Sequence, residues 1–208
     1  MKRCSILAIA LVMTLHGAAT AQPSTTAVDV LSALAQLRAA VGALPTPLQS
    51  PRLQRATQWL AERPAVSTFN PADVSAEYVR SLQRAAELLK EQPAPDVIED
   101  VTAELEAKVE HCRRLGIGMG GLVKLRVNTL RGGQAVSNWR VQALLKFYER
   151  LKGSQPRLFF RPSSPTDMEL EPGRYWVWAV DPVTGRMSER VLVAVTGQKE
   201  LLFDLDIP

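Results

Sequence analysis

Histidine and cysteine, the side chains most used as bases and nucleophiles near neutral pH, are scarce in this sequence. The 208 residues contain two of each. His111 and Cys112 are neighbours in the segment EHCRR, where two following arginines would favour a thiolate. The pair suggests one possible activity, a thiol enzyme with Cys112 as nucleophile and His111 as base. Adjacent helical residues point in different directions, however, and Cys112 lies on an apolar stripe, so we expect a packed thiol beside a solvated histidine.

Carboxylate pairs offer a second route to catalysis, by general acid–base chemistry. Asp96 with Glu99, and Asp100 with Glu104, are spaced at about one turn of a helix. We place both pairs on the exposed side of that helix, where a carboxylate has no need of a tuned pKa. We therefore expect solvated acids and assign no catalytic residue.

The segment GIGMGG matches the spacing of a dinucleotide-binding loop, through Gly116, Gly118 and Gly121. Such a loop follows a strand and opens a helix, so that the phosphates meet the helix N-terminus. Here the order is reversed, because a predicted helix precedes the glycines and a predicted strand follows them. We expect a flexible glycine-rich linker over residues 116–121 and no bound cofactor.

The N-terminus has the three parts of an export signal in the right order. The basic start MKR is followed by an apolar run too short to span a bilayer comfortably, and then by the small residues ATA. We predict a signal peptide over residues 1–21, a mature chain that starts at Gln22, and a periplasmic or secreted location. Cys112 and His111 would then be the last of their kinds, which excludes an internal disulfide and leaves a zinc site short of ligands.

The balance of charge argues against nucleic acid as a partner. Lysine and arginine number 25 against 21 aspartates and glutamates, and removal of Lys2 and Arg3 with the signal leaves 23 against 21. Nucleic-acid binding requires a basic patch or run, which this pattern lacks. No second apolar run approaches the ~18 residues of a membrane helix, so we expect no membrane span after cleavage.

Residues 22–115 have the apolar spacing of helices, with three and four residues between hydrophobic positions. Ser50 followed by Pro51 is typical of a helix start, as is Asn70 followed by Pro71. The last helix is expected to end at Gly116. Four amphipathic helices joined by short loops with proline predict a small helical bundle.

From residue 122 to residue 208 the apolar period changes to two, which is typical of strands. The segments LVKLRVNT, WRVQALLKF, GRYWVWAV, ERVLVAV and ELLFDLDI alternate in this way and are separated by turn residues. We therefore predict an α+β chain in two parts, in which a helical bundle is followed by an antiparallel β-sandwich of the immunoglobulin type.

The second half resembles the carboxypeptidase regulatory-like (transthyretin-like) β-sandwich. The resemblance rests on the turn GGQAV at residues 132–136 and on the signature L-x-PG-x-Y-x-V-x-A, which starts at Leu170. It covers residues 121–208 and nothing in the helical half. In that family such modules are accessory to folding, attachment or recognition. The resemblance implies that Tyr175, Val177 and Ala179 face the core.

Trp176, Trp178 and Val180 then share the opposite face of that strand. We expect this face to be a seam covered by the helical half, with Trp59 and Tyr78 as contacts, or else a surface for a partner. Two indoles at this spacing also suit stacking on successive sugar rings. The sequence thus favours an exported, non-enzymatic binding or assembly module with a protein partner in the cell envelope, and leaves open a carbohydrate-binding protein and the thiol enzyme.

Overall fold

The computed structural model describes residues 26–159 and 161–208, and it confirms an α+β chain with helices first and sheets second. The predicted signal peptide lies outside the described residues. The described part contains four α-helices and four 3-10 turns: α1 (Ala27–Gly42), η1 (Thr46–Leu48), α2 (Pro51–Glu62), η2 (Arg63–Ala65), η3 (Pro71–Asp73), α3 (Ala76–Glu91), α4 (Pro95–Leu115) and η4 (Lys146–Arg150). None of the helices described has the length and apolarity needed to cross a membrane.

Side-chain caps begin α2 and α3, and a glycine ends α4. Ser50 caps α2 as predicted, and Gly116 ends α4 in the left-handed conformation, with φ of 66°. The third helix starts later than predicted. Asn70 caps only the short turn η3, and α3 begins after Ser75, whose hydroxyl accepts a hydrogen bond from the N–H of Tyr78.

The second half forms two four-stranded sheets. One contains β1 and its partners β2, β5 and β8, and the other has the order β4-β3-β6-β7. The strands are β1 (Val123–Arg131), β2 (Gln134–Ala135), β3 (Arg140–Leu145), β4 (Arg157–Leu158), β5 (Thr166–Leu170), β6 (Gly173–Val180), β7 (Val191–Val195) and β8 (Glu200–Asp206). Buried residues alternate along β1, β5 and most of β6, because one face of each strand is turned to the core.

Two details differ from the predicted sandwich. β8 pairs with β1 in parallel, whereas the other pairs are antiparallel, because the chain crosses from the sheet of β7 to the other sheet before β8. The strand expected to reach Phe147 ends at Leu145, and Phe147 lies buried in η4.

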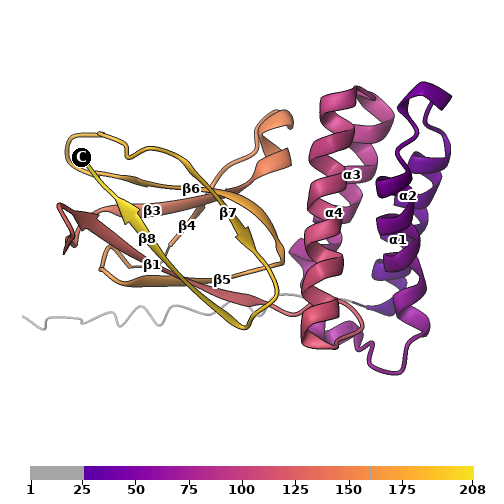
Figure 1. The fold of residues 1–208 in the computed structure, drawn as a ribbon, viewed down its shortest axis with the longest axis horizontal. Helices are drawn as coiled ribbons and strands as arrows, with labels where there is room; N and C mark the ends of the chain where they lie inside the picture. Colours follow the sequence, from indigo (N-terminus) through magenta and orange to yellow (C-terminus); the bar gives the residue numbers. More distant parts are fainter. Residues whose placement is uncertain (1–25, 160) are drawn as a thin grey trace, which may run out of the picture.

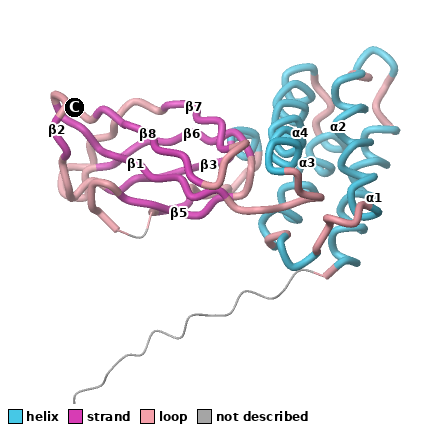
Figure 2. The backbone as a smooth tube through the Cα atoms, turned by 60° about the horizontal axis from the view of Figure 1, so that its bottom comes forward, coloured by secondary structure: helices cyan, strands magenta, loops and turns pink. Residues whose placement is uncertain are grey.

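The helices cover one end of the two sheets. Figure 1 shows the strands running along the long axis toward α3 and α4, with α1 and α2 on the far side, and Figure 2 shows the same order from another direction. Buried hydrophobic residues of both halves belong to a single cluster, so the core continues across the junction.

The glycine segment at this junction is tightly packed, which corrects the prediction of a flexible linker. A Cβ atom on Gly118 would lie 2.6 Å from the Cα of Phe69, and one on Gly120 would lie 2.5 Å from the carbonyl oxygen of Asp73. The N–H of Gly121 donates to that same carbonyl at 3.0 Å. Glycine is needed at 118 and 120 because the neighbouring backbone approaches too closely for any side chain.

Candidate functional site

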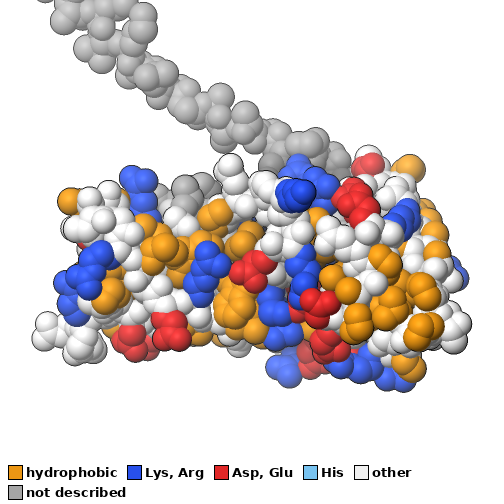
Figure 3. Space-filling view, turned by 90° about the horizontal axis from the view of Figure 1, so that it is seen from above, with side chains coloured by type: hydrophobic (Ala, Val, Ile, Leu, Met, Phe, Trp, Pro, Cys, Tyr) orange, Lys and Arg blue, Asp and Glu red, His pale blue; other side chains and the backbone are white. Residues whose placement is uncertain are grey.

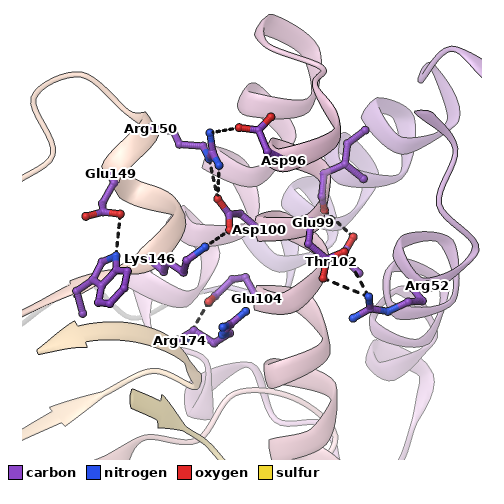
Figure 4. A network of polar contacts seen from close by, with 12 residues as sticks. Arg52, Asp96, Glu99, Asp100, Thr102, Glu104, Lys146, Glu149, Arg150 and Arg174 are labelled. Carbon is purple, nitrogen blue, oxygen red and sulfur yellow. Dashed lines mark hydrogen bonds and ion pairs between the residues drawn. The ribbon is translucent and has the colours of Figure 1, made fainter. Parts of the chain in front are cut away.

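One side of α4 carries a row of polar side chains that meets the sheets. Asp96, Asp100, Glu104, Lys108 and His111 follow one another at intervals of three or four, which places them on one face of the helix. Each makes a hydrogen bond to η4 or to the strand half. We call this row the joint face. Figure 4 shows Asp96, Asp100 and Glu104 pointing toward η4 and β6, while Glu99 points the other way, toward Arg52 of α2.

Lys108 and Glu104 form a fully buried ion pair at the centre of the joint face. Nζ of Lys108 lies 2.8 Å from Oε1 of Glu104 and donates a second hydrogen bond, of 2.7 Å, to the carbonyl oxygen of Pro172. The other carboxylate oxygen of Glu104 accepts from the N–H of Arg174 at 3.0 Å. The ammonium also lies 4.7 Å from the ring centroid of Tyr78. These partners satisfy both charges, as burial requires.

Asp96 and Asp100 bind η4 to the N-terminal part of α4. Arg150 donates to both carboxylates, and Lys146 pairs with Asp100. Burial by itself would raise the pKa of Asp100, but the hydrogen bonds from Lys146 and Arg150 hold it below its ordinary value. From the side of η4, Figure 3 shows acidic and basic side chains gathered where the two halves meet.

A second buried carboxylate lies at the end of β5. Glu171 is 1% exposed, and its Oε2 is 3.2 Å from Arg157, which also reaches Glu77 of α3 at 3.4 Å. Burial raises the pKa of Glu171 above its ordinary value, although the charge of Arg157 opposes the effect. The hydroxyl of Tyr148 donates to Glu77 at 3.3 Å. Arg157 thus ties a strand of one half to a helix of the other.

His111 and Cys112 are both buried, which corrects the prediction of a solvated histidine. Nδ1 of His111 accepts a hydrogen bond of 3.2 Å from the N–H of Gly197, so the proton of the neutral ring is on Nε2. Burial lowers the pKa of His111 to about 4 and raises that of Cys112 to about 11. Both groups are therefore neutral near neutral pH.

Of the four acids expected to be solvated, the structure exposes two and buries or nearly buries the other two. Glu99 is exposed as predicted, and Asp96 is largely exposed, but Glu104 is buried and Asp100 is nearly so. The expectation is wrong for these last two because the strand half covers their side of α4. Among the described residues, no group of three or more histidine, cysteine, aspartate or glutamate side chains is arranged to hold a metal ion.

Trp176, Trp178 and Val180 lie on the outer face of β6, opposite the buried Tyr175, Val177 and Ala179, as the strand period implies. Nε1 of Trp176 donates to Glu149 at 2.7 Å. Trp178 is only 3% exposed, and the guanidinium of Arg190 lies 4.6 Å from its ring centroid. Val180 is partly exposed beside Met187.

These contacts of the two indoles stay within the strand half. The expected neighbours from the helical half are engaged elsewhere. Tyr78 lies beneath Lys108, and Trp59 lies between α2 and α4, with Arg63 and Arg113 at its ring. The seam between the halves therefore combines the continuous apolar core with the charged joint face of α4, whereas these contacts of Trp176 and Trp178 stay within the strand half.

A groove between α2 and α4 is the site that sequence reasoning missed. It has a volume of about 320 Å³ and is lined by Arg52, Arg55, Ala56, Trp59, Glu106, Val109, Glu110 and Arg113. The sequence does contain a signal for this groove, since the spacing of these residues places four of them on one face of each helix. Periodicity could not show that the two faces lie side by side.

In comparisons with known proteins, no protein-family model, no curated protein and no solved structure matches the chain.

Proposed function

We propose that this chain is an exported, non-enzymatic binding or assembly module that contacts a protein partner in the cell envelope. One observation carries the proposal. The side chains best suited to chemistry, namely Glu104, Lys108, His111, Cys112 and Glu171, are buried at the junction of the two halves. Four of them bond or pair across that junction or within the strand half. These side chains stabilise the packing of the two halves and are not accessible to a substrate in solvent.

Burial also weighs against the thiol enzyme. A cysteine nucleophile needs an accessible thiolate and a nearby base that can take up a proton. Cys112 is 1% exposed with a pKa raised to about 11, and His111 has a pKa lowered to about 4. The first change keeps the thiol protonated, and the second makes the imidazole too weak a base to hold the proton of the thiol.

The carbohydrate alternative loses support for a different reason. A stacking platform requires two open indole faces. Trp178 is buried and faces Arg190, and Trp176 is tied to Glu149. The predicted export signal and the resemblance of residues 121–208 to an accessory β-sandwich family support a protein partner instead.

The proposal is tested by photo-cross-linking in the native envelope. A benzophenone amino acid is placed at Glu110, which lines the α2–α4 groove and pairs with Arg114. Glu87 of α3 is the matched control, because it is a helical glutamate of similar exposure that pairs with Arg84. We expect one discrete protein adduct from position 110 and none from position 87. The proposal fails if no adduct forms at 110, or if both positions give the same set of adducts.

A further inference from the structure

The groove lies on the side of α4 that is turned away from the joint face. At 3.6 residues per turn, Glu106, Val109 and Arg113 project roughly opposite to Asp100 and Glu104, and Glu110 lies at the edge between the two faces. The contacts of Arg52 with Glu99 and Glu106, and of Arg113 with Trp59, show that α2 and α4 run in the same direction. The groove therefore runs along two parallel helices of the helical half.

The acids of the groove are already paired. Arg52 binds Glu106 in a two-pronged arrangement, with Nε to Oε1 at 3.0 Å and Nη2 to Oε2 at 2.6 Å. Glu110 is paired with Arg114 at 2.6 Å. These pairs neutralise both carboxylates that line the groove, and they show that its geometry accepts the fork-to-carboxylate contact that arginine favours.

Two further arginines of the groove have no carboxylate partner within the described part of the chain. Arg55 and Arg113 are exposed, and no ion pair is recorded for either. The guanidinium of Arg113 lies 5.5 Å from the ring centroid of Trp59, and that of Arg63 lies 4.1 Å from it. These guanidinium groups, gathered at a half-buried indole, form a surface with uncompensated positive charge.

We infer that this groove is the docking site for an acidic segment of a partner protein, which extends the proposed function and rests on it. Carboxylates of the segment pair with Arg55 and Arg113, which line the groove beside Trp59. A trough along two helices suits an extended segment, because successive side chains can reach successive arginines. Charge complementarity of this kind sets specificity and raises the association rate.

The lining favours a carboxylate-bearing peptide over a phosphate polymer. Glu106 and Glu110 line the groove together with Arg55 and Arg113. Their carboxylate oxygens can also accept hydrogen bonds from the N–H groups of a peptide, which a phosphate chain does not offer.

The test is fluorescence anisotropy of a short fluorescein-labelled peptide of alternating glutamate and leucine, added to the mature chain. We expect saturable binding that weakens as salt is added, and no binding of the same peptide with lysine in place of glutamate. Arg55→Gln and Arg113→Gln should each weaken binding by about tenfold. Arg38→Gln is the matched control, because Arg38 is an exposed arginine of α1 with no ion pair recorded in the described structure.

The inference is overturned if the glutamate peptide does not bind, or if Arg113→Gln and Arg38→Gln bind it equally well. Inorganic tripolyphosphate that binds with the same arginine dependence, while the peptide does not, would assign the groove to phosphates. If the peptide fails but the cross-link from position 110 forms, only the acidic-segment inference falls. If the cross-link also fails, the proposed function falls with it.

Discussion

Lys108 of α4 and Pro172, which directly precedes β6, are 64 residues apart in the chain, and Nζ of Lys108 donates a hydrogen bond of 2.7 Å to the carbonyl oxygen of Pro172. The same ammonium pairs with Glu104, whose carboxylate accepts from the N–H of Arg174. Two buried charges thus join the helical half to the loop that opens β6. Because the hydrogen bonds of each charge come from the strand half or from its own ion-pair partner, the junction tolerates little rearrangement.

Loss of Lys108 should therefore be costly. Lys108→Met leaves Glu104 buried without its cation, and we expect a loss of about 3–5 kcal/mol in the free energy of unfolding. Arg114→Met is the matched control, since it breaks an exposed pair of the same spacing on the same helix. It should cost less than about 1 kcal/mol. Urea denaturation measures both, and equal losses would contradict a buried charged junction. The double variant Lys108→Met, Glu104→Gln should recover part of the loss.

His111 should make stability depend on pH. In the unfolded chain a histidine titrates near its ordinary pKa of 6.5, whereas burial lowers the pKa of His111 in the folded chain to about 4. Between these values the unfolded chain binds more protons, so the stability contributed by the neutral ring is present above pH 6.5 and is lost as the pH falls toward about 4. Urea titrations across this range should show a shallower decline for His111→Gln. If the unfolding free energies of the two proteins fall in parallel with pH, His111 does not have this lowered pKa.

Cys112 should react slowly with thiol reagents in the native chain. Its thiol is buried, and burial raises its pKa to about 11, so little thiolate is present at neutral pH. We expect labelling by a chromogenic disulfide to be far slower in buffer than in denaturing urea. Native labelling as fast as that of a free cysteine would restore the thiol-enzyme alternative.

The sequence predicts the local structure well because caps and periodicity are local signals. Ser50, Gly116 and the alternation along β6 all lie where the pattern placed them. The functions of the two polar faces of α4 were not predictable. Glu104 with Lys108 and Glu110 with Arg114 have the same spacing and chemistry, yet the first pair is buried and the second is exposed. Only the docking of the strand half, a contact between distant segments, distinguishes them.

The same limit explains the tryptophans and the glycines. The strand period shows that Trp178 faces away from the core, but not that Arg190 lies over its ring. A run of glycines suggests flexibility by composition, whereas here it reflects the close approach of the loop around Phe69 and Asp73. Each depends on a tertiary contact that the sequence pattern does not encode.

The packed glycine segment gives a further prediction. Gly118→Ala forces a methyl group against the backbone of Phe69 and should destabilise the chain by about 1–3 kcal/mol. Gly42→Ala is the control, because Gly42 ends α1 with no atom within 4 Å of the added Cβ and no positive φ. That change should be neutral or slightly stabilising, since alanine is the better helix former. Equal melting temperatures for the two variants would mean that Gly118 is not packed closely against Phe69.

The central claim is that one face of α4 joins the two halves while the opposite face receives an acidic partner. The most direct measurement is the yield of the cross-link from position 110 in the native envelope, compared between chains that also carry Arg113→Gln or Arg38→Gln. We expect the adduct to be lost with Arg113→Gln and retained with Arg38→Gln, with the same urea midpoint for both chains. An adduct of equal yield in both would contradict the claim.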